Sequence, residues 1–384
     1  MEICKHAELC GGCVYQGSEY AQQVESKGAE ILRILNEKGV NAENYLGIEG
    51  SPMQCAYRNK MEYTFGNVVK DGEMTLGMHQ RGRFMSVITV DECQLVSEDF
   101  NEILKTTLSF FTERGMTFFH KKSHEGLLRN LIIRKGERTN ELLINLVTTS
   151  QSGFDRDDYV AALLGLNLEN TIVGVLNTIN DNIADAVKCD RLDVLYGRDY
   201  YYEEILDLKF KVSAFSFFQT NIAAVERLYS EALALIDNVE GKTVFDLYCG
   251  TGTITQALAT RARNVFGVEI VEEAVAAARE NALMNGLENT EFIAGDVMSV
   301  LDELNEKPDV IVIDPPRIGI HYKALPKITS YGVNQILYIS CNPKTMADNL
   351  KFMENNGYIV KNIKGYDNFP FTKHTEAVAL LEKR

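Results

Sequence analysis

The sequence contains no run of 18 apolar residues, which excludes a helix that spans a bilayer. It also lacks internal repeats and low-complexity linkers. Its 45% hydrophobic and 24% charged residues are close to the average of soluble globular proteins, which excludes disorder, collagen-like repetition and a small disulfide scaffold. The first ten residues, MEICKHAELC, carry charges where a signal peptide needs an apolar stretch, so we expect a cytoplasmic protein without membrane contact.

Positive charge is scarce as well, with 39 Lys and Arg against 54 Asp and Glu and a net charge of −15. Taken alone, this balance argues against a nucleic-acid partner, because binding to phosphates requires cations. The deficit is not uniform, however, since residues 55–138 hold slightly more basic than acidic side chains. A locally basic module in an acidic chain therefore leaves the class of partner open.

The length of 384 residues predicts two or three compact units. Apolar spacing predicts one amphipathic helix over 14–39, with Leu32 on its apolar side. From about 57 to 148, short strand-like runs alternate with Gly-containing and charged turns. This pattern of short strands and turns predicts an antiparallel sheet with one or two helices, one of them over 96–114.

After about residue 205, near-continuous apolar strands alternate with helices, which predicts a parallel sheet covered on both faces. The strands are expected at 243–248, 264–269, 290–295, 309–314, 335–340 and 358–364. In such sheets, ligands bind outside the carboxyl ends of the strands. The three expected domains are an amino-terminal segment over 1–56, a central α+β domain over 57–204 and an α/β domain over 205–384.

The first of these strands runs into a glycine loop, DLYCGTGT (246–253), whose glycines let the backbone approach a ligand. Thr255 stands where a dinucleotide fingerprint has its third glycine, so NAD is poorly supported. Glu269 closes the second strand, where it can accept bonds from ribose hydroxyls, and Asp296 follows the third, near an expected adenine. A glycine loop followed by acids suits a nucleoside with a positive centre, such as S-adenosylmethionine. The alternative is a glycine turn that binds nothing.

The fourth and fifth strands end in DPPR (314–317) and SCNP (340–343). The two prolines fix φ and hold Asp314 rigidly. Asn342 is a good helix N-cap and the following proline a good first helical residue. Cys341 therefore lies at a helix N-terminus, where the dipole favours the thiolate.

The stretch DNFPFTKHTE (367–376) precedes a last apolar strand and is interpreted as a functional loop that contains His374 and Glu376. A thiolate, a carboxylate and a sulfonium methyl donor together indicate one chemistry. The thiolate adds to C6 of a pyrimidine, C5 becomes nucleophilic and takes the methyl group, and a base removes the C5 proton so that the thiol can leave.

The set of motifs resembles the RNA 5-methyluridine methyltransferases, which are the uracil-5-methyltransferases of tRNA and 23S rRNA. The resemblance lies in FFQTN (217–221), DLYCGTG (246–252), DPPRIG (314–319), YISCNP (338–343), DNFPFTKHTE (367–376) and, in the central domain, YRNKMEY (57–63) and GLLRNLIIR (126–134). It implies an α/β, Rossmann-like methyltransferase domain with a mostly parallel seven-stranded sheet, preceded by a smaller α+β domain. It further implies Cys341 as nucleophile and Glu376 as proton-abstracting base.

The resemblance also implies which side chains contact S-adenosylmethionine. They are Gln219, Tyr248, Gly250, Glu269 and Asp314, with Asp296 as an addition. Gln219 and Asp314 are expected to touch the uracil as well.

Three cysteines crowd the start of the chain as C-x5-C-G-G-C. With Cys93, the residues Cys4, Cys10 and Cys13 resemble the [4Fe–4S] site of the 23S rRNA branch, which implies an iron–sulfur cluster and 23S rRNA as substrate. From spacing alone, a zinc site is nearly as well supported. The other cysteines, Cys55, Cys189 and Cys249, are expected to be packing residues.

Many relatives carry an N-terminal OB-like (TRAM) domain, which we do not expect here because the cysteine motif begins at residue 4. RNA affinity then rests on the central domain. Its candidate contacts are Arg58, Lys60, Arg81, Arg83, Lys121, Lys122, Arg129 and Arg134. The target base must leave its stack to reach Cys341. We expect a monomer, and the sequence implies no protein partner.

Other classes fit less well. A 5-methylcytosine methyltransferase is expected to have a Pro-Cys pair where this chain has Pro316-Arg317, and an amino-group methyltransferase an aromatic residue there and no thiol. A radical enzyme favours C-x3-C-x2-C over the spacing found. A tRNA uracil-5-methyltransferase is expected to lack the cysteine set. A non-catalytic iron–sulfur RNA-binding factor is disfavoured, because Cys341, Glu376, Asp314 and Glu269 are all present.

Overall fold

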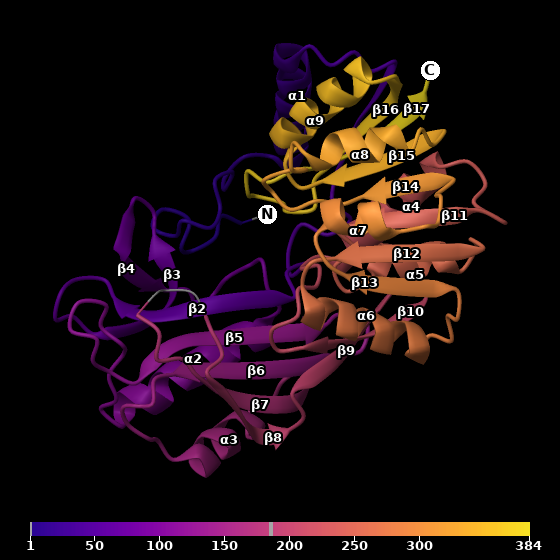
Figure 1. The fold of residues 1–384 in the computed structure, drawn as a ribbon. Coiled ribbons are helices and arrows are strands. Elements are labelled where there is room, and N and C mark those ends of the chain that lie inside the picture. The colour runs from indigo at the N-terminus through magenta and orange to yellow at the C-terminus, as the bar shows by residue number, and fades with distance from the viewer. Residues whose placement is uncertain (1, 184–186) are drawn as a thin grey trace. The chain divides into compact units, whose positions relative to one another are not determined.

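The computed structural model describes residues 2–183 and 187–384 (Figure 1). The chain forms two compact units. Unit 1 consists of Met1–Gly17, Met53–Glu204 and Lys211–Phe215, and unit 2 of Ser18–Pro52, Ile205–Phe210 and Ser216–Arg384. Across the described ranges, no helix is long and apolar enough to cross a membrane.

Unit 1 is built on a seven-stranded sheet in the order β4-β3-β2-β5-β6-β7-β8. Neighbouring strands are antiparallel except β6 and β7, which run parallel. The strands are β2 (Lys60–Asn67), β3 (Met74–Gln80), β4 (Arg83–Thr89), β5 (Leu128–Gly136), β6 (Glu141–Thr148), β7 (Thr171–Ile179) and β8 (Arg191–Gly197). The mainly antiparallel sheet predicted from the alternating runs is therefore confirmed.

Two helices, α2 (Glu98–Glu113) and α3 (Arg156–Leu164), share one apolar core with this sheet. Phe111 of α2 packs edge-on against Phe65 of β2 and lies 5.3 Å, ring to ring, from Tyr159 of α3. The helix predicted over 96–114 corresponds to α2. A separate two-stranded sheet is formed by β9 (Tyr200–Ile205) and β10 (Leu208–Ser213).

Unit 2 contains an eight-stranded sheet in the order β1-β16-β17-β15-β14-β11-β12-β13. Its strands are β1 (Asn44–Glu49), β11 (Thr243–Leu247), β12 (Asn264–Glu269), β13 (Thr290–Ala294), β14 (Val310–Ile313), β15 (Gln335–Ser340), β16 (Tyr358–Tyr366) and β17 (Glu376–Lys383). All neighbours are parallel except β17, which is antiparallel to β15 and β16. The mostly parallel seven-stranded arrangement is confirmed, and β1 adds an eighth strand at its edge.

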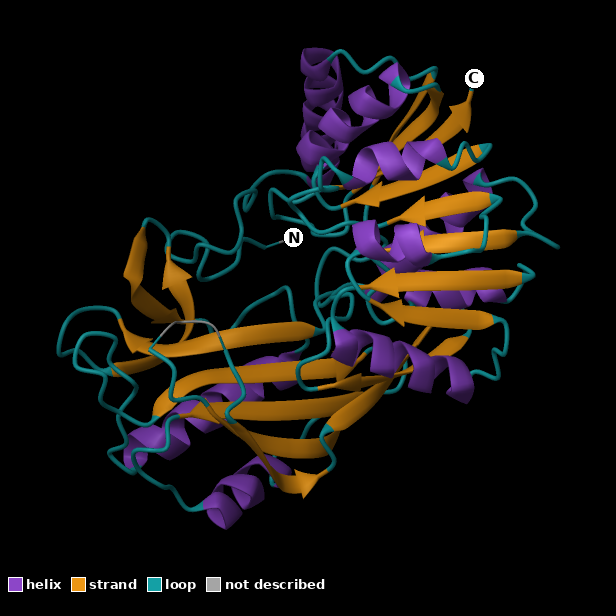
Figure 2. Cartoon of the chain, in the orientation of Figure 1, coloured by secondary structure: helices purple, strands orange, loops and turns teal. Residues whose placement is uncertain are grey.

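Helices cover both faces of this sheet (Figure 2). They are α1 (Tyr20–Lys38), α4 (Ile222–Leu235), α5 (Thr253–Ala259), α6 (Glu272–Met284), α7 (Val297–Glu303), α8 (Ala324–Ser330) and α9 (Pro343–Asn355). The strands are apolar on both sides, as β11 and β15 illustrate with every residue buried. Such strands need helices on each face, which is why this half of the chain alternates the two elements.

Helix α1 differs from the prediction in length and in its buried face. It begins at Tyr20 instead of residue 14, and Leu32 is 39% exposed. The buried face includes Gln23 and Lys27, two polar side chains that an apolar pattern does not detect. We expected 1–56 as one segment, but 18–52 lies in unit 2, because α1 packs against α9 and β1 pairs with β16.

Candidate active site

A tight loop follows β11 and leads into α5. Tyr248, Gly250 and Gly252 all have φ in the left-handed region, at +67°, +54° and +79°. A Cβ atom on Gly252 would lie 2.7 Å from the Phe292 ring, whereas a Cβ atom on Gly250 would meet nothing within 4 Å. The loop is therefore packed tightly at one glycine and open at the other, which gives a ligand access to its backbone.

The carboxylate of Glu269 holds this loop. Glu269 ends β12, and its two oxygens accept hydrogen bonds from the backbone N–H of Gly250 at 3.1 Å and of Val271 at 3.0 Å. Because a carboxylate can accept about four hydrogen bonds, acceptor capacity remains for a ligand hydroxyl. The structure thus places two of the predicted cofactor residues, Glu269 and Gly250, in direct contact.

Asp296 follows β13 and is the N-cap of α7, where its side chain accepts from the N–H of Met298 at 3.0 Å. It is close enough to Tyr248 that its charge, after burial as the main cause, raises the pKa of Tyr248 to about 12. The two predicted residues therefore flank the same loop. The capping role was missed in the sequence, although Asp directly before a helix is a known signal for it.

Asp246, at the base of the loop, is a buried carboxyl group that sequence reasoning passed over. Thr255 donates to its Oδ2 at 2.5 Å, while Oδ1 is buried without a hydrogen-bond partner among the described residues. Burial raises the pKa of Asp246 to about 7, and the bonds from Thr255 oppose the shift. Thr255, which stands where a dinucleotide-binding motif has its third glycine, is the residue whose hydroxyl donates to this carboxyl group.

The register of the sheet brings Cys341 and Glu376 to adjacent positions. In the antiparallel pair of β15 and β17, Ser340 lies opposite Ala377. Cys341 directly follows Ser340, and Glu376, the first residue of β17, directly precedes Ala377, so both residues flank the same end of this strand pair. Asn342 caps α9 by accepting from the N–H of Lys344 at 3.2 Å, as predicted.

The charges around Cys341 differ from the expectation. Burial, followed by the charges of Glu376 and Asp314, raises the pKa of Cys341 to about 11. The helix dipole that favours the thiolate is opposed here by burial first and by the two carboxyl groups second. Burial also raises the pKa of Glu376 to about 7 and, together with the charge of Glu376, that of Asp314 well above its ordinary value.

Arg317 is a site residue that sequence reasoning did not assign. Its guanidinium lies close enough to Cys341 and Glu376 to oppose the rise in the pKa of both. It also lies 3.4 Å from Nδ1 of His374. Asn342 donates to the backbone carbonyl of Arg317 at 2.9 Å, so the loop after β14 is tied to the start of α9. In the sequence, the only feature that pointed to Arg317 was its position directly after two prolines.

Gln219 lies in the segment before α4 and donates to the hydroxyl of Tyr229 at 3.0 Å. Tyr229 is buried, and its pKa is raised by burial and then by the charge of Asp314. Gln219 thus contacts a tyrosine whose pKa is influenced by the charge of Asp314.

The predicted cluster cysteines lie in unit 1. Burial, with smaller contributions from Cys13, Cys4 and Cys10, raises the pKa of Cys93 to about 12, so the four sulfur atoms lie near one another. Arg81 holds their loop by donating to the carbonyls of Ala7, Cys10 and Cys13, the last at 2.6 Å. Within the described part of the chain, no three His, Cys, Asp or Glu side chains are arranged around one metal ion.

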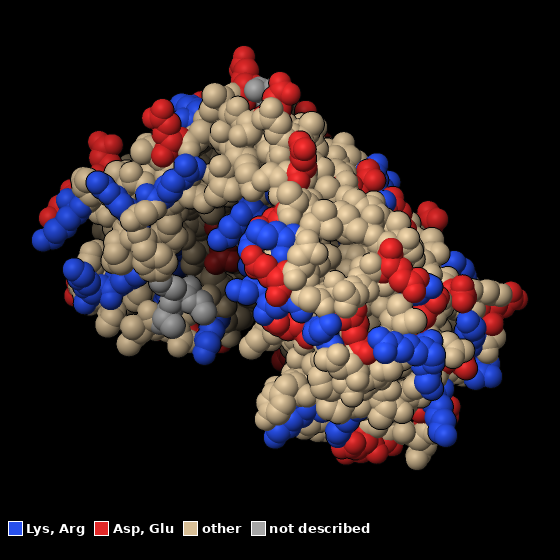
Figure 3. All heavy atoms as spheres, turned by 90° about the horizontal axis from the view of Figure 1, so that it is seen from above, with Lys and Arg blue, Asp and Glu red and all other residues tan. Residues whose placement is uncertain are grey.

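The eight basic candidates for RNA contact differ in exposure. Arg129 and Arg134 are 6% and 3% exposed, and Arg129 donates to the carbonyl of Asn180 at 2.9 Å. Both side chains are buried and that of Arg129 is bound to the protein backbone, so we correct the prediction and do not retain these two as phosphate contacts. Arg83 and Lys122 are exposed. Figure 3 shows Lys and Arg side chains interspersed with Asp and Glu over the face that it draws.

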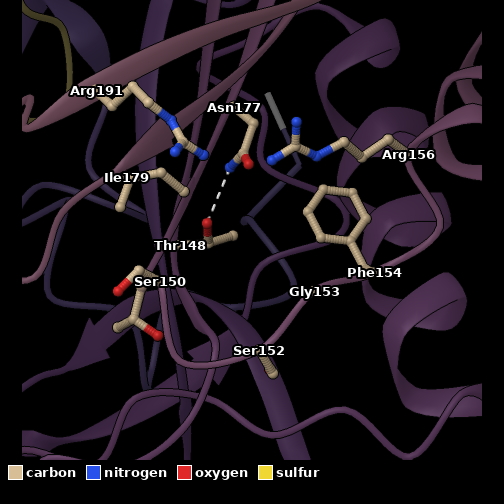
Figure 4. A pocket seen from close by; sticks show the side chains of 10 residues that line it. Thr148, Ser150, Ser152, Gly153, Phe154, Arg156, Asn177, Ile179 and Arg191 are labelled. Atoms are coloured by element: carbon tan, nitrogen blue, oxygen red, sulfur yellow. Dashed lines mark hydrogen bonds between the residues drawn. The ribbon is translucent and has the colours of Figure 1, made fainter.

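Unit 1 also has a cavity of about 360 Å³ (Figure 4). The guanidinium groups of Arg156 and Arg191 point toward Asn177, which donates to the hydroxyl of Thr148 at 3.0 Å. Both arginines pair with one Asp193 oxygen, at 3.0 Å and 2.9 Å, so their charge is largely satisfied within the protein. The ten described residues that line this cavity include none of the predicted site residues.

The α/β fold with its glycine loop, carboxylates and strand-end cysteine defines an S-adenosylmethionine-dependent methyltransferase. The model of the tRNA (uracil-5-)-methyltransferase family matches residues 183–384. The chain therefore belongs to this family, and the resemblance stated from its motifs is confirmed at that level.

Relatives and a solved structure agree with this membership. An uncharacterized RNA methyltransferase of Clostridium tetani is 49% identical over 381 residues, which cover 99% of this chain and 84% of the relative. Another, of Caldanaerobacter subterraneus, is 50% identical over 380 residues with the same coverage. The crystal structure of Pyrococcus abyssi tRNA (uracil-54, C5)-methyltransferase in complex with S-adenosyl-L-homocysteine is similar with a TM-score of 0.78 and 28% identity, covering 97% of this chain and 86% of that chain.

Proposed function

We propose that the protein methylates C5 of a uridine in 23S rRNA, with Cys341 as nucleophile and Glu376 as base. The observation that carries the proposal is that Cys341 and Glu376 flank the last residue pair of β15 and β17, and that the charge of Glu376 acts on the pKa of Cys341. Asp314 is close enough to influence the pKa of Cys341. Membership of the family supports methyl transfer to uracil C5 as the reaction, and Cys341 and Glu376 are the residues proposed for nucleophilic addition and proton removal.

S-adenosylmethionine supplies an electrophilic methyl group on a positively charged sulfonium. The site fits such a cation, because the buried carboxyl groups of Glu376 and Asp314 lie close enough to act on Cys341, and a bound positive charge would favour their ionised forms. The residues proposed to hold it are Gln219, Tyr248, Gly250, Glu269, Asp296 and Asp314. A positive charge beside Cys341 favours its thiolate, so cofactor binding would activate the nucleophile.

The proposed reaction proceeds in three steps. The sulfur of Cys341 forms a bond to C6, and the electron pair of the C5–C6 double bond moves to C5 and the O4 carbonyl. C5 then takes the methyl group, whose bond to the sulfonium sulfur breaks. Finally the Glu376 carboxylate removes the C5 proton, the C5–C6 double bond re-forms, and the thiolate leaves with its electron pair. The products are 5-methyluridine, S-adenosylhomocysteine and one proton.

The test is transfer of labelled methyl groups to total RNA from a strain that lacks the gene, followed by nucleoside analysis and mapping. We expect 5-methyluridine at a position of 23S rRNA and no product with Cys341→Ala. Label on cytidine or adenosine would refute the proposed chemistry. If folded wild-type protein with a loaded cluster transfers no label to any RNA, the non-catalytic RNA-binding factor is favoured.

A tRNA substrate is the second candidate. The observation that favours it is the structure of the Pyrococcus abyssi tRNA (uracil-54, C5)-methyltransferase, which is similar over 97% of this chain. The same experiment separates the two, because label in tRNA retains the chemistry and overturns the rRNA substrate.

We further propose that Cys4, Cys10, Cys13 and Cys93 bind a [4Fe–4S] cluster with a structural role. A single tetrahedral zinc, with Zn–S bonds of about 2.3 Å, needs sulfur atoms roughly 4 Å apart, whereas a cubane takes four thiolates that are spaced more widely. The charge effects of Cys13, Cys4 and Cys10 on Cys93 support a shared ligand for the four thiols, and the resemblance of their spacing to the 23S rRNA branch favours iron–sulfur over zinc.

Iron and sulfide analysis of anaerobically purified protein tests this proposal. We expect four irons per chain in the wild type and in Cys189→Ser, a control at an exposed cysteine outside the set, and loss of iron in Cys13→Ser. Stoichiometric zinc in place of iron would refute the cluster. A methylation rate that changes on reduction of an intact cluster would refute its structural role.

The RNA-binding surface is proposed to lie on unit 1. Its candidates are Arg58, Lys60, Arg81, Arg83, Lys121 and Lys122. Arg83→Ala and Lys122→Ala are expected to weaken RNA binding and to reduce its salt dependence by about one unit of slope each. An unchanged salt dependence in both variants would exclude them as phosphate contacts.

A further inference from the structure

The loop between β16 and β17, residues 367–375, leads directly to Glu376 and is held by a helix from the other end of the sequence. Lys27 of α1 is 3% exposed, and its ammonium donates to Oδ1 of Asp367 at 2.6 Å and to the carbonyl of Phe369 at 3.2 Å. Asp367 is fully buried. A buried ion pair with further hydrogen bonds is highly directional, so this contact fixes where the loop begins.

One turn earlier on the same face of α1, Gln23 makes a second contact. Its side-chain carbonyl accepts from the N–H of Phe371 at 3.1 Å, and Gln23 is 1% exposed. Phe371 has φ of +65°, which is a strained conformation for a bulky residue. Such strain persists only where the surroundings enforce it. Gln23 therefore helps to hold the tip of the loop in a conformation that the loop would not keep alone.

The third contact comes from the FFQTN motif. The side-chain amide of Asn221 donates to the carbonyl of Asn368 at 2.8 Å and to the hydroxyl of Ser51 at 3.2 Å. The backbone of Asp367 in turn donates to the carbonyl of Glu49, the last residue of β1, at 2.8 Å. Figure 1 shows α1 beside α9 and β16, near the carboxyl-terminal end of the chain. The loop is thus anchored from three sides.

At its other end the loop reaches the reacting groups. His374 lies 3.4 Å from the guanidinium of Arg317, and its ring packs edge-on against Phe369. Arg317 in turn contacts Cys341 and acts on the charge of Glu376. A displacement of the loop would therefore change the surroundings of both groups without removing either of them.

We propose that Lys27 and Gln23 are positioning residues for the proton-abstraction step. By holding loop 367–375, helix α1 keeps His374 and Arg317 in place beside Glu376 and Cys341. The inference deepens the proposed function and rests on it. It assigns to the amino-terminal segment of unit 2 a role in catalysis beyond support of the sheet.

The test compares variants that release the loop with one that alters α1 elsewhere. Gln23→Met removes the bond to Phe371, and the double variant Lys27→Met/Asp367→Asn neutralises both partners, so that no unpaired charge is buried. The matched control is Lys38→Met, because Lys38 of the same helix pairs with Asp348 of α9 at 2.5 Å and does not touch the loop. Each protein is mixed with its RNA substrate and labelled S-adenosylmethionine for a single turnover.

Two quantities are measured: the binding of S-adenosylmethionine, and the rate at which the methylated Cys341–RNA adduct resolves. We expect unchanged cofactor binding and resolution slowed roughly 10- to 100-fold in the loop variants, with the adduct accumulating, and wild-type behaviour in Lys38→Met. Normal resolution in folded loop variants overturns the inference. Equal loss of every step together with a lower melting temperature also overturns it, because the contacts are then only structural. Failure of the wild type to form an adduct refutes the proposed function itself, and the inference with it.

Discussion

The pKa of Glu376 leads to a quantitative prediction. Burial raises it to about 7, against an ordinary value of 4.5, and Arg317 limits the rise. As a base, Glu376 acts only as the carboxylate. At pH 6 about one in eleven molecules would be ionised and at pH 8 about ten in eleven, so adduct resolution should become about tenfold faster between these pH values. At this step the methyl group has already been transferred, and no sulfonium charge remains to shift the value.

The assay isolates the step by a jump in pH. The adduct is formed at one pH with RNA that contains tritium at C5 of uridine, and tritium release into water is followed after the jump. This design keeps the titration of Cys341 out of the measured rate. Glu376→Gln should slow the release by about 10²- to 10⁴-fold at every pH, because the base is absent.

The control for this variant is Glu382→Gln, on the same strand β17. Glu382 accepts from the side-chain amide of Gln335 at 3.3 Å and lies at the opposite end of the strand. We expect the wild-type rate and pH dependence. A release rate independent of pH between 6 and 8 in the wild type, or a Glu376→Gln variant as fast as the control, would contradict the assignment of Glu376.

Two further predictions concern the glycine loop. Gly252→Ala should lower the free energy of unfolding by about 1–3 kcal/mol, because its Cβ would lie 2.7 Å from Phe292. The measurement is unfolding in urea, and an unchanged midpoint concentration of urea would refute the prediction. Asp246 binds a proton up to about pH 7 when folded but loses it near pH 4 when unfolded, so its contribution to stability falls as pH rises through this range. Asp246→Asn should therefore gain stability relative to wild type between pH 5 and 8, by at most about 4 kcal/mol; a difference independent of pH would refute this.

Local patterns predicted the sheet of unit 2 well. The strands expected at 264–269 and 335–340 coincide with β12 and β15. Asn342 caps α9 as its sequence indicated. These features depend on residues a few positions apart, so the local sequence is enough to specify them. Cys341 and Glu376 were predicted as site residues for a similar reason, because each follows or begins a strand within a distinctive motif, and their roles stay proposals.

Long-range contacts were not predictable in this way. The buried face of α1 includes Lys27 because its partner Asp367 stands 340 positions later, and no pattern within the helix shows that pairing. An apolar pattern alone therefore assigned Leu32 to the wrong face. The β1 strand was missed for the same reason, since its partner β16 lies near the other end of the chain.

The state of Cys341 shows the same limit for electrostatics. The sequence places the residue at a helix N-terminus, and from that position alone a thiolate is expected. Burial in the fold, followed by the charges of Glu376 and Asp314, raises the pKa of Cys341 to about 11. Arg317, which opposes this rise, comes from a third strand end. The balance between these groups depends on how three strands end side by side, which the sequence does not display.

The central claim is that Cys341 bonds covalently to the uridine it methylates. The most direct measurement uses the RNA substrate with 5-fluorouridine at the target position, because fluorine at C5 cannot be removed as a proton and the adduct cannot resolve. With S-adenosylmethionine present, we predict a complex that survives denaturation and whose peptide map places the RNA and one added methyl group on Cys341. Absence of such a complex in the wild type, or its persistence in Cys341→Ala, would contradict the account.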